Sequence, residues 1–163
     1  MNRKQLKTLA ICAAVAVIAS CASFFGSAAW AQEKKIQKSD LPAAVQKTVD
    51  EQSKGATVRG FSMEKENGKI SYEAELTING KTRDIAMNAT GAITEVEDQV
   101  DFSSLPDMVQ AGLKIKAGAG KILKVESITK KDKLVAYEAV VETSGKKKEV
   151  QVGPDGKPLA HEE

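Results

Sequence analysis

Histidine and cysteine, which often serve as general base and nucleophile, are scarce in this chain of 163 residues. His161 is the only histidine, and it lies in the tail His161-Glu162-Glu163. A general base must be held within hydrogen-bond reach of its substrate, which a terminal tail rarely achieves. Both cysteines, Cys12 and Cys21, fall within the N-terminal segment 1–31. We therefore expect neither Ser-His-Asp nor Cys-His catalysis, and we predict that the protein is not an enzyme.

Carboxylates alternate with apolar residues in two segments, around Tyr72-Glu73-Ala74 and around Tyr137-Glu138-Ala139. Paired carboxylates can act as acid and base when burial raises one pKa. Strict alternation, however, places the polar side chains on the wet face of a half-buried strand. The pattern therefore favours a solvated surface over a catalytic pair. The candidate binding face consists of Ser71, Glu73, Glu75, Glu138, Val140 and Glu142.

The densest acidic cluster comprises Glu95, Glu97, Asp98 and Asp101. Oxygen ligands suit Ca²⁺, but the spacing is not that of an EF-hand loop, and the turn glycine of such a loop is missing. We predict no metal site and no cofactor.

Lysines 130, 131, 133 and 146–148 make the second half of the chain locally basic. Such clusters are usually solvated strand ends that block edge-to-edge aggregation. Without an exposed aromatic platform, nucleic-acid binding is not expected.

The N-terminal segment 1–31 resembles a secretory signal peptide. Basic residues precede an apolar run from Leu9 to about Ala19, and Ala29-Trp30-Ala31 has the A-x-A form of a cleavage site. Cleavage near Ala31 would leave 21 basic and 22 acidic residues, a net charge of −1. Ile18-Ala19-Ser20-Cys21 also resembles a lipobox, so lipidation at Cys21 is the alternative. We expect a periplasmic or secreted protein that contacts a membrane only if Cys21 is lipidated.

The rest of the chain contains a sequence repeat. Leu41-Pro42 recurs as Leu105-Pro106, and Tyr72-Glu73-Ala74 recurs as Tyr137-Glu138-Ala139 at almost the same spacing. A repeat of this length indicates two copies of one structural unit. We place a flexible lead-in at residues 32–38, a domain at 39–159 made of repeats 39–100 and 101–159, and a tail at 160–163.

Each repeat predicts a helix followed by four antiparallel strands. Leu-Pro marks the helix start and a glycine its end. Alternating apolar residues between Asn-Gly, Ser-Gly or Asp-Gly turns then indicate hairpins. Pro154 and Pro158 weaken the last strand of the second repeat, and Gly112 weakens its helix. The predicted fold class is therefore α+β, with about eight strands in one sheet and both helices on one face.

In their order and duplication, the Leu-Pro helix start, the Tyr-Glu-Ala strand and the Gly-Lys and Asp-Gly turns resemble the PepSY-like family, also described as beta-lactamase-inhibitor-like. The resemblance spans nearly all of residues 38–159. It implies an exported bacterial protein of two fused helix-plus-four-strand repeats without assigned catalytic activity. Inhibition or regulation of a peptidase or envelope enzyme would be an analogy, because a fold does not determine a function.

These observations predict a non-enzymatic exported binding module whose partner is a protein in the envelope or outside the cell. The alternative is a periplasmic domain that senses a small ligand or an ion in a groove between the repeats.

Overall fold

A computed structural model of the protein describes residues 33–66, 68–161 and 163. The predicted signal peptide, its cleavage site and Cys21 lie outside the described residues.

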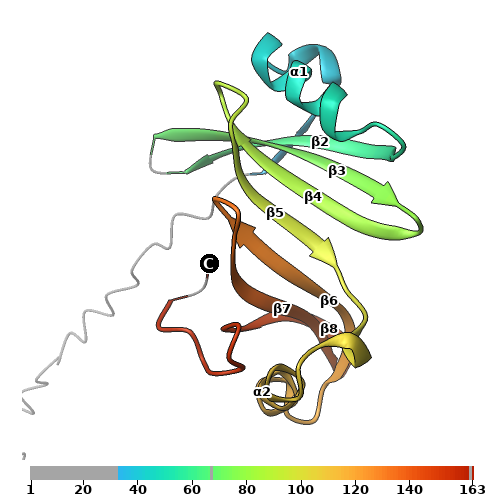
Figure 1. Ribbon diagram of the computed structural model, residues 1–163, viewed down its shortest axis with the longest axis vertical. Helices are drawn as coiled ribbons and strands as arrows, with labels where there is room; N and C mark the ends of the chain where they lie inside the picture. Colours follow the sequence, from blue (N-terminus) through green and yellow to red (C-terminus); the bar gives the residue numbers. More distant parts are fainter. Residues whose placement is uncertain (1–32, 67, 162) are drawn as a thin grey trace, which may run out of the picture. The chain divides into compact units, whose positions relative to one another are not determined.

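The described residues form two α-helices, two short 3₁₀ helices and eight strands (Figure 1). The helices are α1 (Ala43–Gln52) and α2 (Asp107–Ala117), and the 3₁₀ helices are η1 (Lys38–Asp40) and η2 (Phe102–Ser104). The strands are β1 (Lys34–Ile36), β2 (Thr57–Glu66), β3 (Lys69–Ile78), β4 (Lys81–Asn88), β5 (Ile93–Gln99), β6 (Lys121–Lys130), β7 (Lys133–Thr143) and β8 (Lys146–Val152).

All eight strands belong to one antiparallel sheet, in which each strand pairs with its neighbours in the sequence. The two halves of the chain meet where β5 pairs with β6, with Glu95 opposite Lys130 and Gln99 opposite Glu126. The expected α+β class with a single sheet and two helices is therefore confirmed.

The same local device opens both α-helices. A 3₁₀ turn precedes the Leu-Pro pair, and Pro42 or Pro106 occupies the N-cap with an extended backbone. The Gln46 Nε2 atom donates to the Leu41 carbonyl at 2.8 Å, and Gln110 Nε2 donates to the Leu105 carbonyl at 3.0 Å. Each glutamine side chain thus bonds to the carbonyl of the residue that precedes the N-cap proline.

Each helix covers its own apolar cluster. Leu41, Val45 and Val49 pack with Ala74 and Leu76 of β3 and with two residues of β4, Ile85 and Met87. Leu105, Val109, Leu113 and Ala117 pack with Val125, Ala139, Val141, Val150 and Val152 of β6, β7 and β8.

Glycine turns hold both helices against the sheet. A Cβ atom added to Gly91 would lie 2.5 Å from the Ala44 carbonyl oxygen, and one on Gly156 would lie 2.1 Å from the Met108 carbonyl oxygen. A Cβ on Gly112 would lie 2.0 Å from the Gly156 carbonyl oxygen. The glycine expected only to weaken the second helix therefore permits close approach of the helix to the 155–156 turn.

The strands are distributed differently from the prediction. Residues 34–36, expected to belong to a flexible lead-in, form β1 and pair with Phe61, Ser62 and Met63 of β2. The second half contributes three strands, because residues 153–161 adopt turns and irregular structure. Pro154 and Pro158 lack the N–H donors that a fourth strand would need.

Candidate functional site

Sheet register brings carboxylates from both halves of the chain onto one surface. Glu75, Asp84 and Glu97 are successive cross-strand partners on β3, β4 and β5. Glu126 of β6 is paired with Glu138 of β7. Because side chains alternate along a strand, these residues point away from Ala74, Ile85, Val125 and Ala139, which pack under the helices. We call this surface the acidic face, and it comprises Glu73, Glu75, Asp84, Glu97, Glu126, Glu138 and Glu149.

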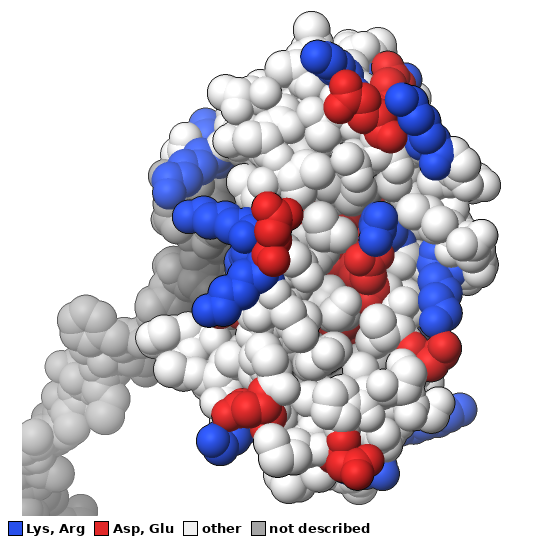
Figure 2. Space-filling model, viewed as in Figure 1, with Lys and Arg blue, Asp and Glu red and all other residues white. Residues whose placement is uncertain are grey.

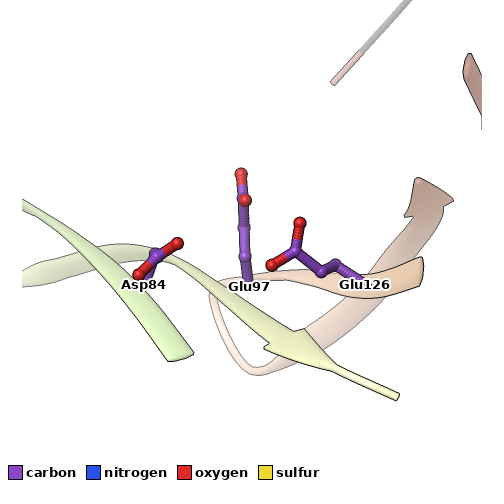
Figure 3. A group of neighbouring side chains, drawn as sticks. All are labelled: Asp84, Glu97 and Glu126. Atoms are coloured by element: carbon purple, nitrogen blue, oxygen red, sulfur yellow. The ribbon is translucent and has the colours of Figure 1, made fainter. Parts of the chain in front are cut away.

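Three of these carboxylates converge at the centre. One oxygen from each of Asp84, Glu97 and Glu126 lies within 4.8 Å of the other two. Figure 3 shows the three side chains projecting to the same side of neighbouring strands. Glu126 is the most buried, with 3% of its side chain exposed. Its Oε1 atom accepts from Thr82 Oγ1 at 3.2 Å, and its Oε2 atom lies 2.7 Å from Lys124 Nζ.

Basic side chains neutralise part of the acidic face. Arg59 is positioned by a bulge in β2 and lies 2.5 Å from Asp84 Oδ1 and 3.4 Å from Glu75 Oε2. Lys35 of β1 also pairs with Glu75. In Figure 2, acidic side chains lie recessed near the middle of the visible surface, with lysine and arginine side chains beside them. Basic side chains therefore neutralise some carboxylates of the acidic face but not all of them.

Among the described residues, four carboxylates of the acidic face lack such a partner: the exposed Glu149 and three half-buried glutamates. Within the described part of the chain, Glu73, Glu97 and Glu138 form no ion pair. Burial, followed by repulsion from Glu138 and Glu126, raises the pKa of Glu97 to about 8. Burial and repulsion from Asp84 raise the pKa of Glu73 to about 7. The negative charge of this surface is therefore costly to maintain at neutral pH.

Burial also raises the pKa of Glu138, although a hydrogen bond from Gln151 opposes this effect. The Gln151 Nε2 atom donates to Glu138 Oε2 at 2.8 Å, and the Glu163 backbone N–H donates to Gln151 Oε1 at the same distance. These residues line a hollow of about 360 Å³ together with Glu97 and Glu149. The size and charge of this hollow suit an alkyl ammonium or guanidinium group.

The candidate binding face predicted from the sequence is divided between two strands. Ser71, Glu73 and Glu75 lie on β3, whereas Glu138, Val140 and Glu142 lie on β7, with β4, β5 and β6 between them. Glu73, Glu75 and Glu138 belong to the acidic face. Asp84 and Glu126, which lie on the strands between them, were not among the predicted site residues. Asp84 alternates with Ile85 in the predicted third strand, and this signal could have revealed it.

The acidic cluster at residues 95–101 also separates. Glu95 and Glu97 point to the acidic face, where Glu95 lies 3.5 Å from Lys130 Nζ. Asp98 points to the other side and receives two hydrogen bonds from Arg83, at 2.5 and 2.8 Å. Asp101 lies 2.7 Å from Lys81 Nζ. Among the described residues, one group of three carboxylates could hold a cation, namely Asp84, Glu97 and Glu126, and its oxygen ligands suit Ca²⁺ or Mg²⁺.

Among the described residues, no helix is long and apolar enough to cross a membrane. His161 is exposed at the end of the irregular C-terminal segment.

No protein-family model matches the sequence, and no curated protein matches it significantly. A protein from Bacteroides eggerthii that is described as periplasmic aligns over 73% of this chain and 86% of its own length, with 15% identity and a TM-score of 0.58. A DUF2874 family protein from Bacteroides ovatus aligns over 73% and 84%, with 19% identity and a TM-score of 0.55. A BLIP-like protein from Bacteroides fragilis aligns over 73% and 83%, with 17% identity and a TM-score of 0.53. These likenesses show a shared fold and support the expected beta-lactamase-inhibitor-like architecture.

Proposed function

We propose that this protein is a non-enzymatic, exported binding module whose acidic face binds lysine or arginine side chains of a partner protein. The observation that carries the proposal is the set of half-buried carboxylates Glu73, Glu97 and Glu138, which form no ion pair within the described residues. A bound cationic side chain would supply the missing counter-charge and lower the cost of their ionisation.

We further infer that the two halves are copies of one helix-on-sheet unit with both helices on the same face. The bulge between Val58 and Gly60 in β2 corresponds to the bulge between Ile122 and Lys124 in β6. The bonds of Gln46 and Gln110 and the contacts of Gly91 and Gly156 also recur at the spacing of the repeat. This arrangement leaves the opposite face, which carries the carboxylates, for binding.

Two observations support the proposal that the protein is exported. The N-terminal segment has the pattern of a cleavable leader. The structurally similar protein from Bacteroides eggerthii bears a periplasmic description. The partner would then be an envelope or extracellular protein, and inhibition or regulation of a peptidase or another enzyme would be one consequence of binding.

The test uses the protein as isolated from an exporting host. We expect it to retain a protein from a matched periplasmic extract after crosslinking, and to bind a hexalysine peptide with an affinity that falls as salt rises. Charge reversal by Glu73→Lys together with Glu138→Lys should weaken peptide binding at least about tenfold, equivalent to about 1.4 kcal/mol.

Glu51→Lys is the matched control, because Glu51 is exposed on α1 and lies outside the acidic face. It makes a charge change of the same kind and should leave binding nearly unchanged. Equal losses in the control and in the double variant would contradict the proposal, as would failure of the wild-type protein to retain any extract protein or the peptide.

The convergence of Asp84, Glu97 and Glu126 favours ion sensing as the second candidate function. Added Ca²⁺ would then raise the thermal midpoint, and Glu97→Gln would reduce this rise. Glu95→Gln is the control, since Glu95 shares the strand and face but lies outside the group of three. A midpoint indifferent to Ca²⁺, Mg²⁺ and chelator would exclude this candidate and leave the protein-binding proposal intact.

A further inference from the structure

The outer side of α2 exposes two large apolar side chains in line. Met108 is 62% exposed and Ile115 is 81% exposed, the two highest exposures among the large hydrophobic residues described. They are separated by close to two helical turns, and the exposed Ala111 lies between them on the same side. The opposite side of α2 packs on the apolar residues of β6, β7 and β8. Met108 and Ile115 therefore contribute nothing to that core.

Lysines flank this apolar line. Lys114 and Lys116 are exposed neighbours of Ile115, and a helical step of about 100° places them on either side of it. The Lys114 Nζ atom lies 5.4 Å from the centre of the Phe102 ring, and Lys121 follows the helix after a glycine turn. The nearest acids are Asp107, in the first turn of α2, and Glu142, which is paired with Lys121. Asp155 lies in the turn that packs against Met108, and it pairs with Lys157 at 3.0 Å. The C-terminal part of this side is therefore positively charged.

The corresponding side of α1 has the opposite character. When the repeats are aligned with Val45 at the position of Val109, Ala44 is equivalent to Met108 and Glu51 is equivalent to Ile115. Asp50 stands for Lys114 and pairs with Lys38. Because the two helices use equivalent residues in their cores, packing does not account for the apolar and basic surface of α2.

We propose that the outer side of α2 docks onto an anionic lipid surface. Met108 and Ile115 would enter the headgroup region, and Lys114 and Lys116 would contact lipid phosphates. Amphipathic helices bind such surfaces by combining buried apolar area with electrostatic attraction. This contact is independent of the acidic face, and it goes beyond the expectation that only lipidation of Cys21 would bring the protein to a membrane.

Charge and area favour lipid over a second copy of the chain. Stable interfaces bury roughly 800 Å² on each partner, far more than two side chains provide. A symmetric contact would also bring the lysines of the two copies toward each other, whereas a lipid surface supplies opposite charge at every lysine.

The test is flotation of the protein, isolated from an exporting host, with two kinds of vesicle. One contains equal parts of phosphatidylglycerol and phosphatidylcholine, and the other contains phosphatidylcholine alone. We expect binding to the anionic vesicles that decreases with added salt. Met108→Ser with Ile115→Ser should reduce the partition coefficient at least about tenfold. Lys114→Glu with Lys116→Glu should reduce it similarly for anionic vesicles.

Glu51→Ser in α1 is the matched control and should leave partitioning unchanged. All substituted side chains are exposed, and unchanged far-ultraviolet circular dichroism and thermal midpoints would verify folding of the variants. The proposal is overturned if the wild-type protein floats with neither vesicle, or if the apolar variant floats as well as wild type. It is also overturned if sedimentation shows a dimer that Ile115→Ser dissociates while vesicle binding is unaffected.

Discussion

Glu97 lies half-buried on β5, and the groups that disfavour its charge belong to four strands. Glu138 and Glu126 approach from the second half of the chain, and Glu95 and Glu73 from the first. Asp84, by contrast, shares its environment with Arg59 at 2.5 Å. Glu73, Glu97 and Glu138 have no basic partner among the described residues, and their pKa values are raised. Burial raises the pKa of Asp84 as well, although the Arg59 guanidinium opposes this effect.

At the scale of the residue, we predict that stability falls as pH rises. The pKa of Glu97 is about 8 in the folded protein against an ordinary value of 4.5, so the folded state binds the proton more tightly. The stability linked to this proton is present below pH 4.5 and is lost as pH rises to about 8. The raised pKa of Glu73 acts in the same direction. Denaturant unfolding across this pH range measures the effect.

Glu97→Gln should flatten this dependence. Above pH 8 the substitution should stabilise the fold by roughly 1 kcal/mol, a modest value because water screens a partly exposed charge. Near the lower end of the range it should change little, since the native glutamate is then protonated. Glu142→Gln is the control variant, because Glu142 lies on β7 opposite Lys121 and Lys147. An unchanged slope for Glu97→Gln would contradict this account of the charge.

At the scale of the element, glycine turns secure each helix through close backbone contact. The φ angles of Gly91 and Gly145 are almost equal, at 77° and 76°. A Cβ on Gly91 would lie 2.5 Å from the Ala44 carbonyl oxygen, whereas a Cβ on Gly145 would meet nothing within 4 Å. Alanine substitutions at these two glycines therefore separate the free-energy cost of the backbone conformation from the cost of the close contact.

We predict that Gly145→Ala costs about 1 kcal/mol of unfolding free energy, the conformational penalty alone. Gly91→Ala should cost roughly 3 kcal/mol, because α1 must also move away from the turn. Chemical denaturation of the two variants measures both values. Equal costs would show that the turn does not anchor the helix.

For Gly112→Ala, helix propensity and packing predict changes in stability of opposite sign. Propensity alone predicts that Gly112→Ala stabilises α2 by about 1 kcal/mol. The structure predicts destabilisation, by roughly 2 kcal/mol or more, because the new Cβ would lie 2.0 Å from the Gly156 carbonyl oxygen. Thermal or denaturant unfolding determines the sign, and a stabilised variant would exclude the close contact.

At the scale of the whole molecule, pairing of β5 with β6 makes one acidic face from two halves of the chain. Glu138 is the first source of repulsion on Glu97, although the two residues belong to different halves of the sequence. Removing a charge in one half should therefore change the free-energy effect of removing a charge in the other half.

A double-mutant cycle tests this coupling. Above pH 8, Glu97→Gln and Glu138→Gln should each relieve the same repulsion, so their combined effect should be smaller than the sum by about 0.5–1 kcal/mol. Glu97→Gln with Glu51→Gln should be additive, because Glu51 lies on α1. Additivity in both cycles would indicate that the two halves do not share an electrostatic surface.

Local sequence signals determined much of the architecture. Alternation around Tyr72 and Tyr137, with glycine turns between strands, predicted most of the strands and, in β3 and β7, the side that carries the carboxylates. The Leu-Pro pairs predicted the helix starts. These features depend on residues close together in the chain, so one sequence is enough to predict them.

Only the tertiary structure decided which carboxylates meet. Asp84, Glu97 and Glu126 come from three strands, and their convergence requires the β5–β6 pairing. Bulges in β2 and β6 shift the register, and the alternation within one strand does not specify such a shift across its neighbours. The packing role of Gly112 could not be predicted either, because it depends on contact with the distant turn at Gly156. The sequence alone therefore determined most of the elements, though not β1, whereas pairing between distant segments decided the composition and the burial of the acidic face.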